Sequence, residues 1–233
     1  MTKQGILYGV GVGPGDPELL TLKAVRLLQE ADVIAAPDKG NGEQVALRIV
    51  DRWIQGKPLL SCPMPMTREQ AVLDRCHDEV ANSIGALLDQ GKTVVFITLG
   101  DPTVYSTYLY LHRRILAMGY RAELVPGVPS FCAAAARLNV SLCEGSQRLM
   151  IVPASRTELA DCLEQDANLV FMKAGRELGT LRQALIEHGL MKRASMVADC
   201  GMPSEAVWEH LEDAPETSGY FTIVVVRQGE NAT

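Results

Sequence analysis

Short apolar runs alternate with longer amphipathic stretches along the first half of the chain. Residues 6–12 predict a strand. Residues 21–30 predict a helix, because Leu22, Val25 and Leu28 recur at helical spacing. The same alternation predicts strands over 33–36, 93–99 and 122–125 and helices over 42–54, 68–90 and 105–118. The 93–99 run is apolar or β-branched at nearly every position, which is typical of a strand buried on both faces of a mainly parallel sheet.

A turn-rich segment at 126–130, Pro-Gly-Val-Pro-Ser, predicts a boundary between two domains, 1–127 and 128–233. Beyond it the pattern predicts strands over 149–152, 169–172, 195–198 and 220–226, with helices over 156–164 and 178–188. No clear helix precedes the last strand, so part of this second sheet is expected to be antiparallel. The fold class is therefore α/β in two domains, mainly parallel in the first and mixed in the second.

Composition narrows the class of protein. The 233 residues are 47% hydrophobic and 21% charged, as in a folded globular chain, and the formal net charge of −6 argues against nucleic-acid binding. No apolar run approaches a membrane span, and no signal peptide is recognisable, so we expect a cytoplasmic protein. The six cysteines lack a C-x-x-C pair and the four histidines lack an H-E-x-x-H pattern, so we expect free thiols and no metal site.

The first strand runs into a glycine-rich turn, G-V-G-V-G-P-G-D-P, which begins at Gly9. A dinucleotide fingerprint, G-x-G-x-x-G, fails here in both registers, because its third glycine falls on Pro14 or on Asp16. Pro14 has no N–H for a phosphate, and the Asp16 carboxylate would repel one. Two interpretations stay open: a loop whose backbone approaches an uncharged or cationic ligand, or a tight turn capped by Asp16 with Pro17 at the first helical position.

A second polar segment follows the strand at 93–99, where ligands of open α/β sheets bind. Gly100 exposes its backbone, Asp101 brings a carboxylate, and Ser106 and Thr107 bring hydroxyls. A capped loop, with Asp101 as the N-cap, explains the same residues equally well.

Two further segments follow strands in the same way, at 126–131 and 172–176. Core packing competes with ligand binding at Met172, and Lys173 and Arg176 are more typical of surface charges. Thr222, at the start of the last strand, could face a cleft.

Taken in order, these loops resemble the tetrapyrrole (corrin/porphyrin) methylase family, the class III S-adenosylmethionine-dependent methyltransferases. Residues 9–24 are similar to the family's G-x-G-P-G-D-x-x-L-(L/I)-T-x-(K/R)-A signature, and Gly100-Asp101-Pro102 to its G-D-P signature. Residues 126–131 are similar to its P-G-(I/V)-x-S-x segment, and Met172-Lys173 to a strand end of the second domain. The stretch 96–107 is most similar to the branch that methylates C-20 of precorrin-2 or cobalt-factor II.

This resemblance implies a S-adenosylmethionine cofactor held in a cleft between the two domains, a tetrapyrrole substrate rich in carboxylates, and a homodimer. Membership would place cofactor contacts, largely through backbone groups, at Pro14, Gly100, Asp101, Val104, Tyr105, Ser106, Thr107, Pro129, Ser130, Met172 and Ala198. Catalysis would consist mainly of in-line placement of the acceptor carbon. Asp101 is the first candidate for the base that removes the displaced proton, although it could instead only hold the cofactor.

Other acceptors would suit the same fold: uroporphyrinogen III, another precorrin position or a diphthamide precursor. Two further classes are a nucleotide-binding regulatory or dinucleotide protein and an RNA ribose methyltransferase. The broken glycine fingerprint argues against the first, and the acidic balance argues against the second.

Overall fold

The computed structural model describes residues 5–228 apart from 39–43, 66, 68 and 155–158. The chain forms two compact units, Met1–Pro129 and Ser130–Thr233. The division follows Pro129, inside the turn-rich segment, whereas the sequence places the boundary after residue 127.

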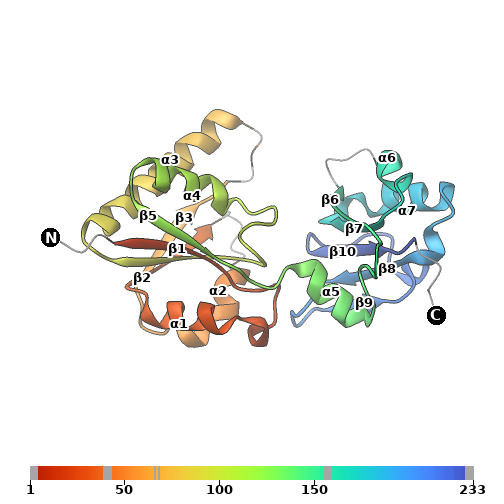
Figure 1. Ribbon diagram of the computed structural model, residues 1–233, viewed down its shortest axis with the longest axis horizontal. Helices are drawn as coiled ribbons and strands as arrows, with labels where there is room; N and C mark the ends of the chain where they lie inside the picture. Colours follow the sequence, from red (N-terminus) through yellow and green to blue (C-terminus); the bar gives the residue numbers. More distant parts are fainter. Residues whose placement is uncertain (1–4, 39–43, 66, 68, 155–158, 229–233) are drawn as a thin grey trace. The chain divides into compact units, whose positions relative to one another are not determined.

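The first unit is built on a five-stranded sheet in the order β3-β2-β4-β1-β5, and every neighbouring pair is parallel. Its strands are β1 (Ile6–Gly11), β2 (Val33–Asp38), β3 (Leu59–Pro63), β4 (Thr93–Thr98) and β5 (Arg121–Val125). Its helices are α1 (Leu22–Glu30), α2 (Val45–Val50), α3 (Gln70–Asp89) and α4 (Tyr108–Ala117). Helices α3 and α4 lie on one face of this sheet, and α1 and α2 on the other (Figure 1). The parallel sheet expected from the 93–99 run is confirmed.

Local chemistry sets the ends of several of these helices. Thr21 caps α1, since its hydroxyl accepts a hydrogen bond from Ala24 N at 3.1 Å. Gly91 follows α3 with a φ of 75°, a left-handed conformation that suits glycine after a helix. Arg114 of α4 ties α4 to α3 through ion pairs with Asp74 at 2.6 Å and Asp78 at 2.7 Å. With helices on both faces of the sheet, the central strand β4 is almost wholly buried.

The second unit holds a mixed sheet in the order β6-β7-β10-β8-β9. Its strands are β6 (Leu149–Pro153), β7 (Asn168–Met172), β8 (Ala194–Ala198), β9 (Ala206–Trp208) and β10 (Thr222–Val226). Its helices are α5 (Ser130–Leu138), α6 (Leu159–Leu163) and α7 (Leu178–Glu187). The last strand, β10, runs antiparallel to both β7 and β8, as the sequence predicts.

Several elements differ from the sequence prediction. Strand β3, helix α5 and strand β9 were not predicted. The helix expected from residue 105 begins only at Tyr108, because residues 101–107 form turns stabilised by side-chain hydrogen bonds. The start of the helix expected over 42–54 and part of that over 156–164 lie outside the described residues. None of the helices in the described parts of the chain combines the length and apolarity needed to cross a bilayer.

Candidate functional site

Three strand ends of the first unit meet through their glycines. Beyond β1, Val12 N donates to Thr98 O at 2.9 Å, and Gly13 and Gly100 exchange backbone hydrogen bonds of 3.3 and 2.7 Å. Gly127 follows β5, and a Cβ on it would lie 2.3 Å from the Gly100 oxygen. A Cβ on Gly11 would lie 2.6 Å from both the Gly100 oxygen and the Gly127 nitrogen. Glycine is therefore required here so that three backbone segments can lie in contact.

Gly100 itself is buried, but there is room beside its Cα that a side chain could fill. Its φ of 70° is left-handed, and a Cβ placed on it would meet no atom within 4 Å. A small space therefore lies beside the end of the central strand β4, next to the close backbone contacts of Gly11 and Gly127. An uncharged or cationic ligand fits this position better than a phosphate, since Pro14 offers no N–H and the Asp101 carboxylate is adjacent.

Asp101 fastens two of these strand ends together. Its side chain is buried, and Oδ2 accepts a 3.0 Å hydrogen bond from Gly127 N, 26 residues further along the chain. Its Oδ1 accepts from Thr103 N at 2.7 Å and also from the Thr103 hydroxyl. Both carboxylate oxygens therefore have protein donors, a geometry that favours a positioning role for Asp101 over proton abstraction. The role as general base stays a prediction.

The residues that follow form a strained turn over the end of β4. The Ser106 hydroxyl lies 3.0 Å from the Thr98 hydroxyl and accepts from Tyr108 N at 3.3 Å. Tyr105 has a φ of 48°, which is uncommon for a non-glycine residue, and 48% of its surface is exposed. Strain of this kind gathers where a loop is shaped for binding.

A buried tyrosine at the start of α4 packs beside this turn, and it was not among the predicted site residues. The ring of Tyr108 lies where a side chain on Gly9 would be, since a Cβ there would come within 1.9 Å of the ring. Its hydroxyl is 3.1 Å from His112 Nδ1, and burial raises the pKa of that hydroxyl far above its ordinary value. Tyr108 therefore stays neutral, and Gly9 serves packing within the unit. A glycine within a strand, Gly9, indicates that a large side chain packs against that position, and the aromatic Tyr108 was a candidate for it.

The second unit carries its own group of predicted residues at one edge of its sheet. Met172 ends β7 and Ala198 ends β8, and both are paired with β10, opposite Ile223 and Thr222. Both are buried, as is Thr222. Ser130 begins α5 and is half-buried.

Each unit thus gathers its share of the predicted contacts. Pro14, Gly100, Asp101, Val104, Tyr105, Ser106 and Thr107 belong to the first unit and lie in the loops beyond β1 and β4. Pro129 ends the first unit, and Ser130, Met172 and Ala198 belong to the second. That the two groups contact one cofactor in a common cleft stays a prediction.

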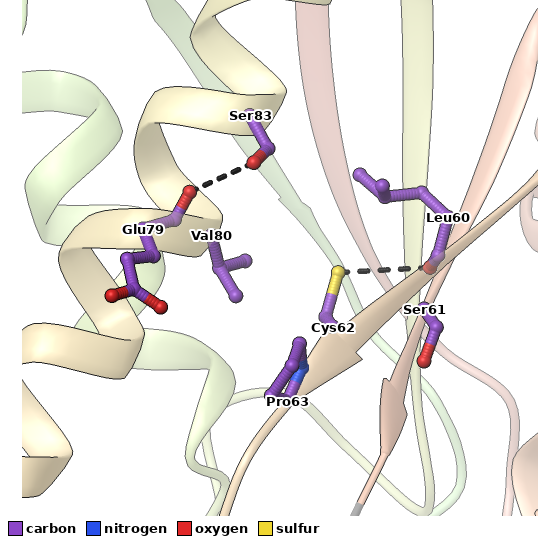
Figure 2. A pocket seen from close by; sticks show the side chains of 7 residues that line it. All are labelled: Leu60, Ser61, Cys62, Pro63, Glu79, Val80 and Ser83. Atoms are coloured by element: carbon purple, nitrogen blue, oxygen red, sulfur yellow. Dashed lines mark hydrogen bonds between the residues drawn. The ribbon is translucent and has the colours of Figure 1, made fainter.

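A hollow of about 190 Å³ lies elsewhere in the first unit, between β3 and α3 (Figure 2). It is lined by Leu60, Ser61, Cys62, Pro63, Glu79, Val80 and Ser83, none of which is a predicted site residue. Cys62 is fully buried and its Sγ lies 3.7 Å from Leu60 O, and burial raises the pKa of the thiol to about 12. The thiol is therefore protonated and unreactive at neutral pH. Within the described residues, no three histidine, cysteine or carboxylate side chains gather as a metal site would require.

The family model of the tetrapyrrole (corrin/porphyrin) methylases matches residues 6–215. The chain therefore belongs to the tetrapyrrole methylase family.

Particular members of that family are similar along nearly the whole chain. The cobalt-precorrin-2 C(20)-methyltransferase of Salmonella typhimurium is 35% identical over 98% of this chain and 99% of its own. The precorrin-2 C(20)-methyltransferase of a Sinorhizobium species is 33% identical over 95% of each chain. Among solved structures, the uroporphyrin-III C-methyltransferase of Thermus thermophilus complexed with S-adenosylhomocysteine has a TM-score of 0.70 at 24% identity, covering 95% of this chain and 97% of its own.

Proposed function

We propose that this chain transfers the methyl group of S-adenosylmethionine to C-20 of precorrin-2 or cobalt-precorrin-2, a step of cobalamin biosynthesis. The assignment rests on full-length similarity to two C(20)-methyltransferases. One is named for cobalt-precorrin-2 and the other for precorrin-2. The other acceptors considered above have no comparable support.

The residues of the first unit suit such a donor. S-adenosylmethionine supplies an electrophilic methyl group on a sulfonium, so no metal is needed to activate it. Gly100 brings an uncharged backbone with room beside its Cα to the end of β4, and Asp101 keeps the neighbouring loops in place. An ionised Asp101 carboxylate is negatively charged, and this charge favours a cationic ligand nearby. Holding donor and acceptor in line contributes on the order of 7–11 kcal/mol to such a reaction.

The acceptor and the position of the new methyl group test the proposal directly. The protein is incubated with S-adenosylmethionine and precorrin-2, cobalt-precorrin-2 or uroporphyrinogen III in separate reactions. Mass spectrometry counts the methyl groups added, and NMR assigns the carbon. We expect one methyl group, at C-20, on one or both of the first two acceptors. Methylation of uroporphyrinogen III alone, or of another carbon, would refute the assignment.

We further propose that the protein works as a homodimer in the cytoplasm, which the family resemblance implies. Light scattering after size-exclusion chromatography measures the mass directly, against 25.3 kDa for one chain. A single species at the monomer mass across the micromolar range would contradict the dimer.

A further inference from the structure

The end of β7 holds a strained lysine. Lys173 directly follows β7 and has φ and ψ of 58° and 34°, in the left-handed region. Only four non-glycine residues in the described parts of the chain have positive φ, and two of them, Lys173 and Asp199, follow β7 and β8. These two strands run in the same direction, both antiparallel to β10, so the two strained residues lie at the same edge of the sheet as Met172 and Ala198. A lysine in this conformation is strained, and the surrounding structure must offset that strain.

A close backbone contact lies next to Lys173, between the loop after β7 and the segment before β10. Gly175 packs directly on the segment that precedes β10, because a Cβ on Gly175 would lie 1.9 Å from Gly219 O and 2.5 Å from Ser218 O. Only glycine permits this approach. The contact places Tyr220 beside the end of β7, where the Lys173 ammonium lies 5.5 Å from the centre of its ring.

Among the described residues, the Lys173 ammonium contacts an aromatic ring and has no ion-pair partner. Asp199, at the same sheet edge, accepts a 2.8 Å hydrogen bond from the Ser204 hydroxyl. An aromatic face stabilises a cation without neutralising it, so the ammonium remains available to an anion. Lys173 is half-buried, which reduces screening of its charge by water.

We propose that Lys173 binds a carboxylate of the tetrapyrrole substrate and so helps to determine which acceptor is held and in what position. This inference rests on the proposed function, which supplies an acceptor with acidic side arms. Lysine suits the task because its ammonium is a compact charge on a flexible stem, which can follow a mobile acetate or propionate arm. Lys173 is accordingly a specificity-determining residue, and it takes no part in methyl transfer itself.

Three variants isolate the charge from the backbone strain. Lys173→Met keeps the stem and removes the ammonium, and Lys173→Arg keeps the charge. Lys173→Gly removes the charge while relieving the left-handed strain, so it guards against misfolding. Lys192→Met, at an exposed position of the same unit, is the matched control.

For Lys173→Met and Lys173→Gly we expect KM for cobalt-precorrin-2 to rise about tenfold, as for the loss of one charged hydrogen bond. We expect kcat and the Kd of S-adenosylhomocysteine, measured by calorimetry, to stay within about twofold. Lys173→Arg should restore most of the affinity, and Lys192→Met should behave as the wild type. Raising the salt concentration should increase KM of the wild type more than that of Lys173→Met.

Two results would overturn the inference: a wild-type KM in both charge-removing variants, or an equal loss of S-adenosylhomocysteine affinity, which would assign Lys173 to the cofactor. Direct titration with cobalt-factor II, followed by its visible absorption, measures the Kd of this ligand for the wild type and the Lys173 variants without turnover. A wild-type protein that binds this ligand through Lys173 but methylates no acceptor would refute the proposed function alone. A wild-type protein that methylates C-20 with no contribution from Lys173 would refute this inference alone.

Discussion

Replacing Asp101 by asparagine tests whether this carboxylate holds the strand ends together. The change preserves the shape of the side chain but converts one acceptor oxygen into an NH₂ donor. All three partners of Asp101 are donors: Gly127 N on one oxygen, and Thr103 N and its hydroxyl on the other. Asparagine therefore cannot satisfy both sides in either orientation of its amide. The orientation that keeps both Thr103 bonds turns the amide nitrogen toward Gly127 and leaves that buried N–H unpaired.

The magnitude follows from these contacts. An unpaired buried donor costs about 1–3 kcal/mol, and the two hydrogen bonds to Thr103 lose their charged acceptor, at roughly 0.5–1 kcal/mol each. Removing a carboxylate that is only 8% exposed offsets part of this, because an ionised group is costly to bury. We expect Asp101→Asn to lower the free energy of unfolding of the first unit by about 2 kcal/mol.

Urea unfolding measures this loss unit by unit. The chain has two tryptophans, Trp53 in the first unit and Trp208 in the second. On a Trp208→Phe background, fluorescence reports on the first unit, and a loss of about 2 kcal/mol moves its midpoint by about 1 M urea. Asp16→Asn is the matched control, since the Asp16 side chain accepts a hydrogen bond from Glu18 N at an exposed position and asparagine caps a helix equally well.

A midpoint of Asp101→Asn within error of Asp16→Asn would refute this reasoning. Activity separates positioning from proton abstraction. A positioning residue should weaken S-adenosylhomocysteine binding along with stability. A general base would instead lose methyl transfer in single turnovers while stability and cofactor affinity remain unchanged.

Four further changes probe the rest of the structure. Gly127→Ala forces a Cβ against a neighbouring backbone oxygen and should cost the first unit about 1–3 kcal/mol in urea unfolding, whereas Gly179→Ala, in open space on α7, should stabilise the second unit by about 0.5–1 kcal/mol. Arg182→Met removes the guanidinium that donates to two backbone carbonyls of the 211–214 turn, and Trp208 fluorescence should report a loss of about 2 kcal/mol; an unchanged midpoint would contradict this role. Burial, and after it the Arg114 guanidinium, lowers the pKa of His77 in the folded protein. Below about pH 6.5 the unfolded chain therefore binds a proton at His77 more readily than the folded chain does, and the free energy of unfolding should fall as the pH drops. The pH dependence of the urea midpoint should be flatter in His77→Gln, and an unchanged slope would remove His77 from the explanation.

The sequence by itself determined the parts of this protein that depend on local pattern. The continuous apolar run at 93–99 favoured a strand inside a mainly parallel sheet, and the absence of a clear helix before the strand at 220–226 favoured antiparallel pairing; both predictions are confirmed. The ordered series of strand-end motifs was equally local, because each lies within a few residues, and it was enough to indicate the family. The argument against a dinucleotide site was also local, because it rested on Pro14 and Asp16, which stand where the fingerprint requires its third glycine.

Tertiary structure decided what depends on contacts between distant residues. Strand β3 is an edge strand with largely exposed residues, so it shows little apolar pattern, and α5 begins directly after the turn signals at 126–129. The hydrogen bond from Gly127 to Asp101 and the contact of Tyr108 with Gly9 join segments that no local spacing relates. Folding brings such groups together only when the sheet closes, which is why the sequence left Asp101 open as either cap or ligand. Only the structure shows that its oxygens are occupied.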